Sequence, residues 1–317
     1  MISFILHQKK KKEFGSLEMA KENKVTGDKH ADKDLLVYSW NVDGLRPDVW
    51  KWMKPWLIKE RPHVLCLNET KRSDAVLLST FAEIGDQYEA ILNCHKPASY
   101  HGVAVLVRKD VSFRQLPVKL SCTTRYDTTS KDPACGRVIA IELLGAFNIN
   151  IVATYCPNAG VGHPPLKNLP YRIQQWDPAL FAFLNEMRAL KPTLWIGDIN
   201  VAPMPIDVSD PKKMARWAGF TQEERDSFAK LIATGEWIDI WRQQHPKAIG
   251  YSYRGKEEKW SKSYGLRLDN CVVSDSLQSM VKDSFIVSEC SAPTDHVAVG
   301  VRLCLPGGLE TVVSKDT

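Results

Sequence analysis

Short apolar runs alternate with polar segments along most of the chain, and each run has the length of a β-strand. Every second residue from Phe147 to Ala153 is apolar, which is the period of a strand with one buried face. Many such runs with few strand–helix–strand units indicate antiparallel or mixed sheets packed face to face, with helices outside. The predicted strands cover residues 35–40, 63–67, 102–108, 137–143, 147–155, 193–196, 267–273 and 297–303.

Two segments instead show helical spacing. We expect Asp177 to cap a helix that begins at Pro178, because both residue types favour those positions. A second helix is predicted over residues 48–60, with a kink or a late start at Pro55. The apolar stripe of the first helix consists of Leu180, Phe183, Leu184 and Met187. Strands and helices together predict an α/β fold.

The chain has 317 residues, of which 44% are hydrophobic, so it is long enough to bury one large core. No linker divides it after residue 33, and we predict one domain over residues 34–305 and a flexible tail over 306–317.

No apolar run is long enough to span a bilayer, and no membrane contact is expected. The eight cysteines lack metal-binding spacing, so we expect reduced thiols.

Residues 1–33 differ from the rest in composition. They hold eight Lys against five acidic residues, with almost no apolar periodicity after Leu6, so a disordered arm is predicted. The run from Lys9 to Lys12 has three interpretations: a nuclear import signal, a phosphate-binding tail or a tail that only solubilises. We expect a nuclear protein, with the cytoplasm and the mitochondrion left open.

Polar side chains gather where the predicted strands end. Carboxylates so placed are costly to bury alone, so they either face water independently or converge on a cation. Oxygen ligands suit Mg²⁺ or Mn²⁺, and no Cys/His cluster indicates zinc. A cation, an acid–base group, amide donors and a His–Asp pair can together hydrolyse a phosphodiester. The residues are Asn41 and Asp43, Asn68 and Glu69, Tyr155 and Asn158, Asp198 and Asn200, Asp269, and Asp295 with His296.

Six motifs contain these residues, and weaker similarity fills the gaps between them over about residues 35–304. They are SWNVDGLR from Ser39, LCLNETK from Leu65, YCPNAG from Tyr155, GDINVA from Gly197, GLRLD from Gly265 and TDH from Thr294. In this order they resemble the exonuclease III family of apurinic/apyrimidinic endonucleases. The resemblance implies a four-layered α/β sandwich and a DNA-repair hydrolase that cuts the backbone 5′ to abasic sites.

The resemblance also implies a Mg²⁺ site, with Mn²⁺ as the alternative ion. Glu69 would be the main ligand, and Asp43 would lie near it. Asn41 and Asp295 would support the ion or its waters.

Further roles implied by the resemblance concern the scissile phosphate. Asp198 would orient or deprotonate the attacking water, and Asn200 would hydrogen-bond the phosphate. His296, oriented by Asp269, would donate to a phosphate oxygen as charge builds in the transition state. Additional donors would be Tyr155 and Asn158.

Substrate choice depends on positions that depart from the family or align less well with it. Asn68 stands where the family usually has Gln, one methylene longer. Tyr253 would form the aromatic wall of a pocket for a base-free sugar, with Leu266 and Leu268 opposite. We expect a monomer that acts on double-stranded DNA with abasic or 3′-blocked sites. The sequence does not rank incision, 3′ trimming and 3′ to 5′ exonuclease activity.

Two other interpretations are open at this stage. A phosphoesterase of the wider superfamily would act on RNA, a phosphorylated small molecule or a lipid. A catalytically inactive DNA-binding protein would keep the fold without the reaction. Every expected acidic and amide position is filled, which favours an active enzyme, and the sequence Arg267-Leu268-Asp269 favours the DNA-repair branch.

Overall fold

The computed structural model describes residues 34–98, 100–124, 129–255, 265–287 and 293–307. Within them, one six-stranded sheet consists of β1 (Asp34–Asn41), β2 (Val64–Asn68), β3 (Tyr88–Asn93), β4 (Val103–Arg108), β11 (Val281–Ile286) and β12 (Val299–Cys304). A second consists of β5 (Phe113–Leu116), β6 (Val138–Leu143), β7 (Ile149–Tyr155), β8 (Thr193–Asp198), β9 (Trp237–Asp239) and β10 (Asp269–Ser274). The strand orders are β11-β12-β1-β2-β4-β3 and β5-β6-β7-β8-β10-β9. Only β1 with β2 and β7 with β8 pair in parallel among these strands.

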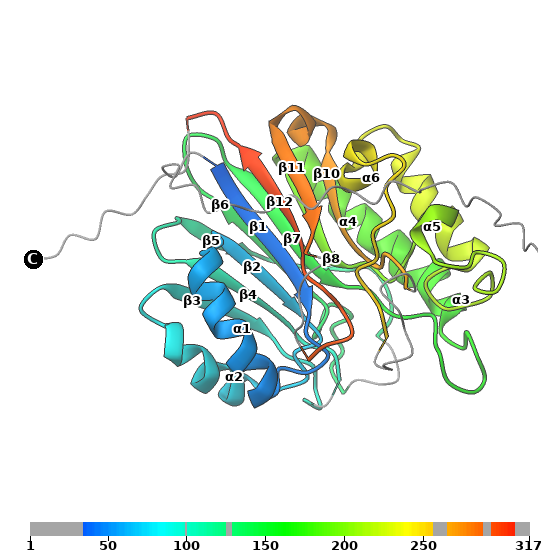
Figure 1. Cartoon of the computed structure of the whole chain (residues 1–317), viewed down its shortest axis with the longest axis horizontal. Coiled ribbons are helices and arrows are strands. Elements are labelled where there is room, and N and C mark those ends of the chain that lie inside the picture. The colour runs from blue at the N-terminus through cyan, green and yellow to red at the C-terminus, as the bar shows by residue number, and fades with distance from the viewer. Residues whose placement is uncertain (1–33, 99, 125–128, 256–264, 288–292, 308–317) are drawn as a thin grey trace, which may run out of the picture.

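The two sheets pack face to face and helices cover both outer faces, so the four-layered α/β sandwich is confirmed (Figure 1). α1 (Pro47–Glu60) and α2 (Asp74–Phe81) cover the first sheet, and α4 (Asp177–Leu190) and α5 (Gln222–Ile232) cover the second. Successive residues of one strand enter different layers: Val37 packs between the sheets, whereas Tyr38 packs under α1. The shorter helices are α3 (Leu169–Tyr171), α6 (Ile240–Gln244), the 3₁₀ turns η1 (Ala82–Ile84), η3 (Pro205–Asp207) and η4 (Asp275–Met280), and the π-helical turn η2 (Arg172–Trp176).

Both predicted helices exist, but their starts differ from expectation. Asp177 is not a cap: it is the first residue of α4, directly after the π-helical turn, and makes no capping hydrogen bond. Its carboxylate is buried, pairs with Arg172 and accepts a 2.7 Å hydrogen bond from Ser227 Oγ. α1 begins at Pro47 and continues through Pro55, which neither delays its start nor ends it. The predicted stripe of α4 is buried.

All eight predicted runs overlap strands, and the four strands that were not predicted are the edges of the two sheets. These are β3, β5, β9 and β11. Edge strands are partly exposed and carry polar side chains, as in β5, where Arg114 and Gln115 are exposed. The apolar pattern that reveals a central strand is therefore weak in them.

Seven cysteines are free thiols, and Cys290 lies outside the described residues. Cys66, Cys94, Cys156 and Cys271 are buried, while Cys304 is exposed.

The predicted arm over 1–33 and most of the predicted tail, 308–317, also lie outside the described residues. No helix in the described part of the chain is long and apolar enough to cross a membrane.

Candidate active site

The two parallel strand pairs bring the predicted residues to one end of the sandwich. Asn41 and Asn68 are opposite each other at the ends of β1 and β2, and Tyr155 and Asp198 hold the same relation at the ends of β7 and β8. Asp269, at the start of antiparallel β10, lies opposite Asp198. β8 extends two residues beyond its predicted end. A Cβ at Gly197, where φ is +146°, would lie 2.0 Å from the Thr154 carbonyl oxygen, so glycine is needed for this pairing.

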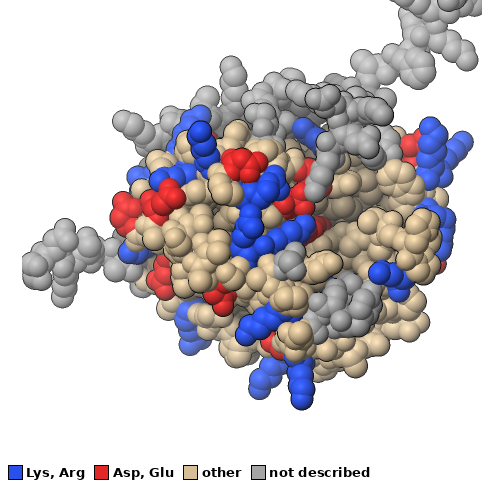
Figure 2. Space-filling view, turned by 90° about the horizontal axis from the view of Figure 1, so that it is seen from below, with Lys and Arg blue, Asp and Glu red and all other residues tan. Residues whose placement is uncertain are grey.

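A cavity of about 680 Å³ opens at this end. Figure 2 shows this face of the molecule, where acidic side chains lie beside a central hollow and Lys and Arg side chains are spread around it. Asn41 and Asp269 do not line the cavity but are hydrogen-bonded to residues that do. The predicted site residues that line it are Asp43, Glu69, Tyr155, Asn158, Asp198, Asn200, Tyr253, Leu266, Leu268, Asp295 and His296.

Backbone strain is concentrated around this cavity. Glu69 has φ of 52° and Asn200 has φ of 53°, in the left-handed region that few residues other than glycine adopt. Asp43 and Lys71 share this conformation, with φ of 43° and 51°. Such strain persists where the surrounding structure determines it, and it often accompanies function.

One half of the site is acidic and holds a cation of the chain itself. Lys71 Nζ lies 2.5 Å from Glu69 Oε2 and 2.7 Å from Asp43 Oδ1. Asn41 Nδ2 donates to Glu69 Oε1 at 3.1 Å and to Asp198 Oδ2 at 2.9 Å. Burial would raise the pKa of Glu69, but the charge and hydrogen bond of Lys71 outweigh it and the pKa is lowered. Glu69 is therefore ionised at neutral pH, as a cation ligand must be.

The other half pairs two carboxylates with an imidazole. His296 Nδ1 lies 2.6 Å from Asp269 Oδ2. Burial disfavours a charged imidazole, but the Asp269 carboxylate stabilises it and raises the pKa of His296 to about 10. Burial, reinforced by the negative charge of Asp269, raises the pKa of Asp198 to about 8.

Ligand atoms of Asp198, Asp269 and His296 lie within 4.8 Å of one another, close enough to surround a metal ion. The Asp269 carboxylate favours the charged form of the His296 imidazole, and this form suits donation to an anion. The two halves therefore differ in chemistry. The Asp43–Glu69 half suits a hard cation, and the Asp198–Asp269–His296 half suits proton transfer and donation to an anion.

Amide and phenol donors line the cavity between the two halves. Asn158 Nδ2 donates to Asn200 Oδ1 at 2.9 Å, and Asn200 Nδ2 donates to the Cys156 carbonyl at 2.9 Å. Each of these bonds uses one of the two hydrogens on its amide nitrogen. The Tyr155 hydroxyl is hydrogen-bonded to Glu69, and burial raises its pKa well above the usual value, so it stays a donor.

Asn68 links the two sheets directly under the site. Its Oδ1 accepts hydrogen bonds from Ser39 Oγ and from the Asp198 backbone N–H, both at 3.1 Å, and its Nδ2 donates to the Thr154 carbonyl at 3.1 Å. The departure from Gln at this position therefore bears on how Asp198 is held. No sequence pattern indicated this contact, because it joins strands far apart in the chain.

Arg172 is a residue to which the sequence assigned no role. It is 3% exposed, and its Nη1 and Nη2 donate to the carbonyls of Pro157 and Ile199, both at 2.7 Å. The two carbonyls belong to the residues directly before Asn158 and Asn200. One guanidinium therefore holds both segments that carry the amide donors. Arg172 lies in a stretch of the weaker family similarity between the motifs, which was the available signal.

The predicted apolar pocket forms one wall of the cavity. Tyr253 and Leu266 pair in an antiparallel bridge and pack with Leu268, so they lie side by side and not on opposite walls. The Tyr253 ring centroid is 5.0 Å from that of His296, which brings the pocket next to the acid–base half. Residues 256–264 of the connecting segment lie outside the described residues.

Comparison with known proteins identifies the family. The profile of the Endonuclease/Exonuclease/phosphatase family matches residues 38–296. The chain belongs to this family. It is 34% identical over 274 residues to a DNA-(apurinic or apyrimidinic site) endonuclease of Dictyostelium discoideum, covering 85% of this chain and 71% of that protein. An exodeoxyribonuclease of Bacillus subtilis is 30% identical over 271 residues, covering 84% of this chain and 98% of that protein.

A solved structure has the same fold. The AP endonuclease of Leishmania major superposes with a TM-score of 0.73 at 29% identity, covering 86% of this chain and 89% of that one. Family and fold together make this chain a hydrolase of the type that includes apurinic/apyrimidinic endonucleases and exodeoxyribonucleases.

Proposed function

We propose that this chain is a Mg²⁺-dependent DNA-repair phosphodiesterase. It hydrolyses the backbone 5′ to abasic sites in base excision repair and trims blocked 3′ ends, including by 3′ to 5′ exonuclease action. The observation that carries the proposal is the placement of a cation-binding carboxylate pair, a buried Asp–His–Asp group and an apolar pocket around one cavity.

The residues present fit a divalent cation. Lys71 Nζ already lies between Asp43 and Glu69, which is direct support for a site that holds positive charge. Glu69 and Asp43 would hold Mg²⁺, or Mn²⁺ in its place, while Asn41 orients Glu69 and Asp295 faces the same cavity. When bound, the ion would neutralise negative charge on the scissile phosphate.

The chain's own groups would supply the proton transfer. Asp198 is held by the Asn41 side chain at Oδ2 and by the Asn200 backbone N–H at Oδ1, so its orientation is fixed. A carboxylate with a pKa near the working pH is a suitable base for a water molecule. Asp198 therefore orients and deprotonates the attacking water.

The remaining groups would stabilise the transition state. His296 is an imidazolium whose Nδ1 is fixed by Asp269, which leaves Nε2 to donate to a phosphate oxygen. Asn158 and Asn200 add amide donors, and Tyr155 adds a hydroxyl. A phosphorane carries more charge than the ground-state phosphodiester, so donors fixed in advance lower the barrier.

Substrate selection would depend on Tyr253, Leu266 and Leu268. A small apolar wall beside His296 accommodates a sugar without its base better than a complete nucleotide. Extruding a residue from the helix costs least where the base is missing. Abasic duplex DNA is therefore the preferred substrate.

Cleavage assays on four oligonucleotides test this proposal: a duplex with a tetrahydrofuran abasic analogue, the undamaged duplex, a duplex with a 3′-blocked nick, and an RNA strand. Each is incubated with Mg²⁺ or with EDTA. We expect incision 5′ to the analogue and removal of the 3′ block, with Mg²⁺ only. Asp198→Asn should cut at least about a hundredfold more slowly, and Asp86→Asn, which alters an exposed turn, should be fully active. Cleavage in EDTA, or a preference for RNA or undamaged duplex, would contradict the proposal.

We also propose a nuclear location, directed by Lys9 to Lys12, and a monomeric enzyme. Replacing the four lysines with Gln in the tagged full chain should redistribute it out of the nucleus without changing kcat. If they contact DNA instead, the slope of log affinity against log salt should flatten by about 0.9 per lost phosphate contact. An unchanged distribution together with an unchanged slope would leave only a solubilising role.

A further inference from the structure

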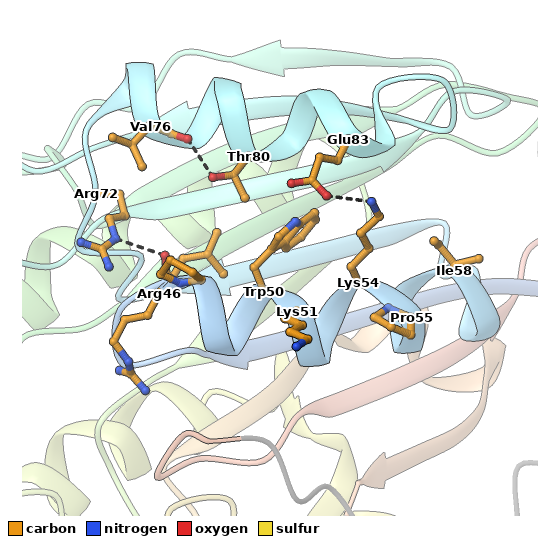
Figure 3. A pocket seen from close by; sticks show the side chains of 12 residues that line it. Arg46, Trp50, Lys51, Lys54, Pro55, Ile58, Arg72, Val76, Thr80 and Glu83 are labelled. Carbon is orange, nitrogen blue, oxygen red and sulfur yellow. Dashed lines mark hydrogen bonds and ion pairs between the residues drawn. The ribbon is translucent and has the colours of Figure 1, made fainter.

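A groove of about 1010 Å³ lies between α1 and α2 on the outer face of the first sheet (Figure 3). Trp50 lies between the two helices, is only 6% exposed, and packs edge-on against Phe81 with ring centroids 5.6 Å apart. Ile58 of α1 and Val76 of α2 line the groove and are 42% and 47% exposed. Apolar side chains of two facing helices are thus left in contact with water.

Positive charge predominates along the groove. The lining cations are Arg46, Lys51, Lys54 and Arg72, against one carboxylate, Glu83. Lys54 Nζ lies 2.7 Å from Glu83 Oε2 and neutralises it, and Arg46 reaches the exposed Asp48 at 3.3 Å. Arg72 donates to the Leu45 carbonyl at 3.1 Å, a neutral partner that leaves its charge in place. The groove therefore attracts acidic ligands.

The groove is separate from the catalytic cavity. None of the residues that line it lines the cavity. The groove approaches the cavity at Arg46, whose Nη1 donates to the carbonyl of Asp43 at 2.9 Å. A ligand in the groove would therefore leave the substrate site open.

The combination of charge and exposed apolar surface identifies the kind of ligand. A nucleic-acid backbone would contact the cations but leave Ile58 and Val76 uncovered. A peptide with carboxylates beside apolar side chains would match both features, as amphipathic segments do in hydrophobic grooves. We propose that the α1–α2 groove docks an acidic amphipathic segment of a partner protein. This inference does not rest on the proposed function.

A displayed library of random peptides of about 16 residues, long enough for about four helical turns, provides the probe. Peptides enriched on the full chain are synthesised with a fluorophore, and their affinity is measured by anisotropy. Ile58→Glu places a carboxylate on the apolar wall, and Lys51→Glu reverses a charge at an exposed position. Leu190→Glu is the matched control, because Leu190 is 69% exposed on α4, across the molecule.

We expect the enriched peptides to combine Asp or Glu with large apolar residues. Ile58→Glu and Lys51→Glu should each weaken binding about tenfold or more, and Leu190→Glu should leave it unchanged. Rates of abasic-site cleavage should be equal in all variants. If a thermal melt shows that Ile58→Glu is not folded, the peptide affinity of Lys51→Glu alone tests the inference, because Lys51 lies on the surface.

Three results would overturn the inference: no enriched peptides, enriched peptides without acidic residues, or equal losses in the control. A fourth result, in which the groove variants weaken binding of duplex DNA but not of peptide, would assign the groove to nucleic acid.

Discussion

The two halves of the active site neutralise their carboxylates in different ways. In the acidic half, Asp43 and Glu69 are paired with the ammonium group of Lys71, whose side chain is 31% exposed. In the acid–base half, Asp269 is paired with His296, whose side chain is 6% exposed. The first counter-charge is therefore partly exposed to solvent, whereas the second is buried.

This difference explains how carboxylates of one cavity can serve different chemistry. Where the neutralising group is the partly exposed Lys71, we propose that the two carboxylates bind an exchangeable cation. Where the neutralising group is the buried imidazole of His296, Asp269 orients it as a proton donor, and burial together with the charge of Asp269 raises the pKa of Asp198. The local counter-charge, and not the carboxylate itself, determines the role.

The largest effect should come from removing the base. Asp198→Asn keeps the shape of the side chain, and we expect kcat on abasic duplex to fall about 10²–10⁴-fold, the usual contribution of acid–base catalysis. Affinity for the duplex, measured by anisotropy, should be retained or improved because an anion facing phosphate is lost. A kcat within a few-fold of wild type would remove Asp198 from the mechanism.

The next effect concerns the acidic half. Glu69→Gln replaces a charged ligand with a neutral one, and we expect the half-saturating Mg²⁺ concentration to rise by at least about tenfold. High Mg²⁺ should restore part of the rate. A Mg²⁺ titration of the cleavage rate measures this, and an unchanged titration would show that the cation lies elsewhere.

The pH profile should report the acid–base half. Burial and Asp269 raise the pKa of Asp198 to about 8, and only the deprotonated form is a base. The rate should therefore rise about tenfold per pH unit below that pKa and level off above it. A flat wild-type profile across this range would contradict the assignment.

The smallest effect should come from changing Lys71, the partly exposed counter-charge. Lys71→Met removes the ammonium that contacts Asp43 and Glu69, and Mg²⁺ should then bind more tightly by about two- to fivefold, the size expected for a partly exposed ion pair. Lys109→Met, on an exposed turn, is the control and should not change the titration. Weaker Mg²⁺ binding in Lys71→Met would show that the lysine assists the cation.

The fold could be predicted from the sequence where burial is complete. The eight interior strands contain short apolar runs or alternate apolar with polar residues, so their pattern was clear. The edge strands were not predictable: β9 has only three residues, and β5 exposes Arg114 and Gln115. The start of α4 was misplaced by one residue. Asp177 forms a buried ion pair with Arg172 instead of capping the helix, and the local sequence does not reveal this pair.

The part of the site that could be predicted consists of residues that lie at the ends of strands. Parallel pairing places the ends of β1 with β2, and of β7 with β8, at one edge, so the polar groups after them must meet. The position of Lys71 between two carboxylates, and the support given by Asn68 and Arg172, depend on contacts between distant segments. Such contacts require the tertiary structure.

A Mg²⁺ titration of single-turnover cleavage, with Asp198→Asn beside Glu69→Gln on the tetrahydrofuran duplex, tests the separation of the two halves most directly. Distinct halves predict that Asp198→Asn keeps the wild-type half-saturating Mg²⁺ concentration within about threefold while its maximal rate collapses. Glu69→Gln should shift the half-saturating concentration by about tenfold or more. If Asp198→Asn shifts the Mg²⁺ requirement as far as Glu69→Gln does, Asp198 belongs to the cation site and the division is wrong.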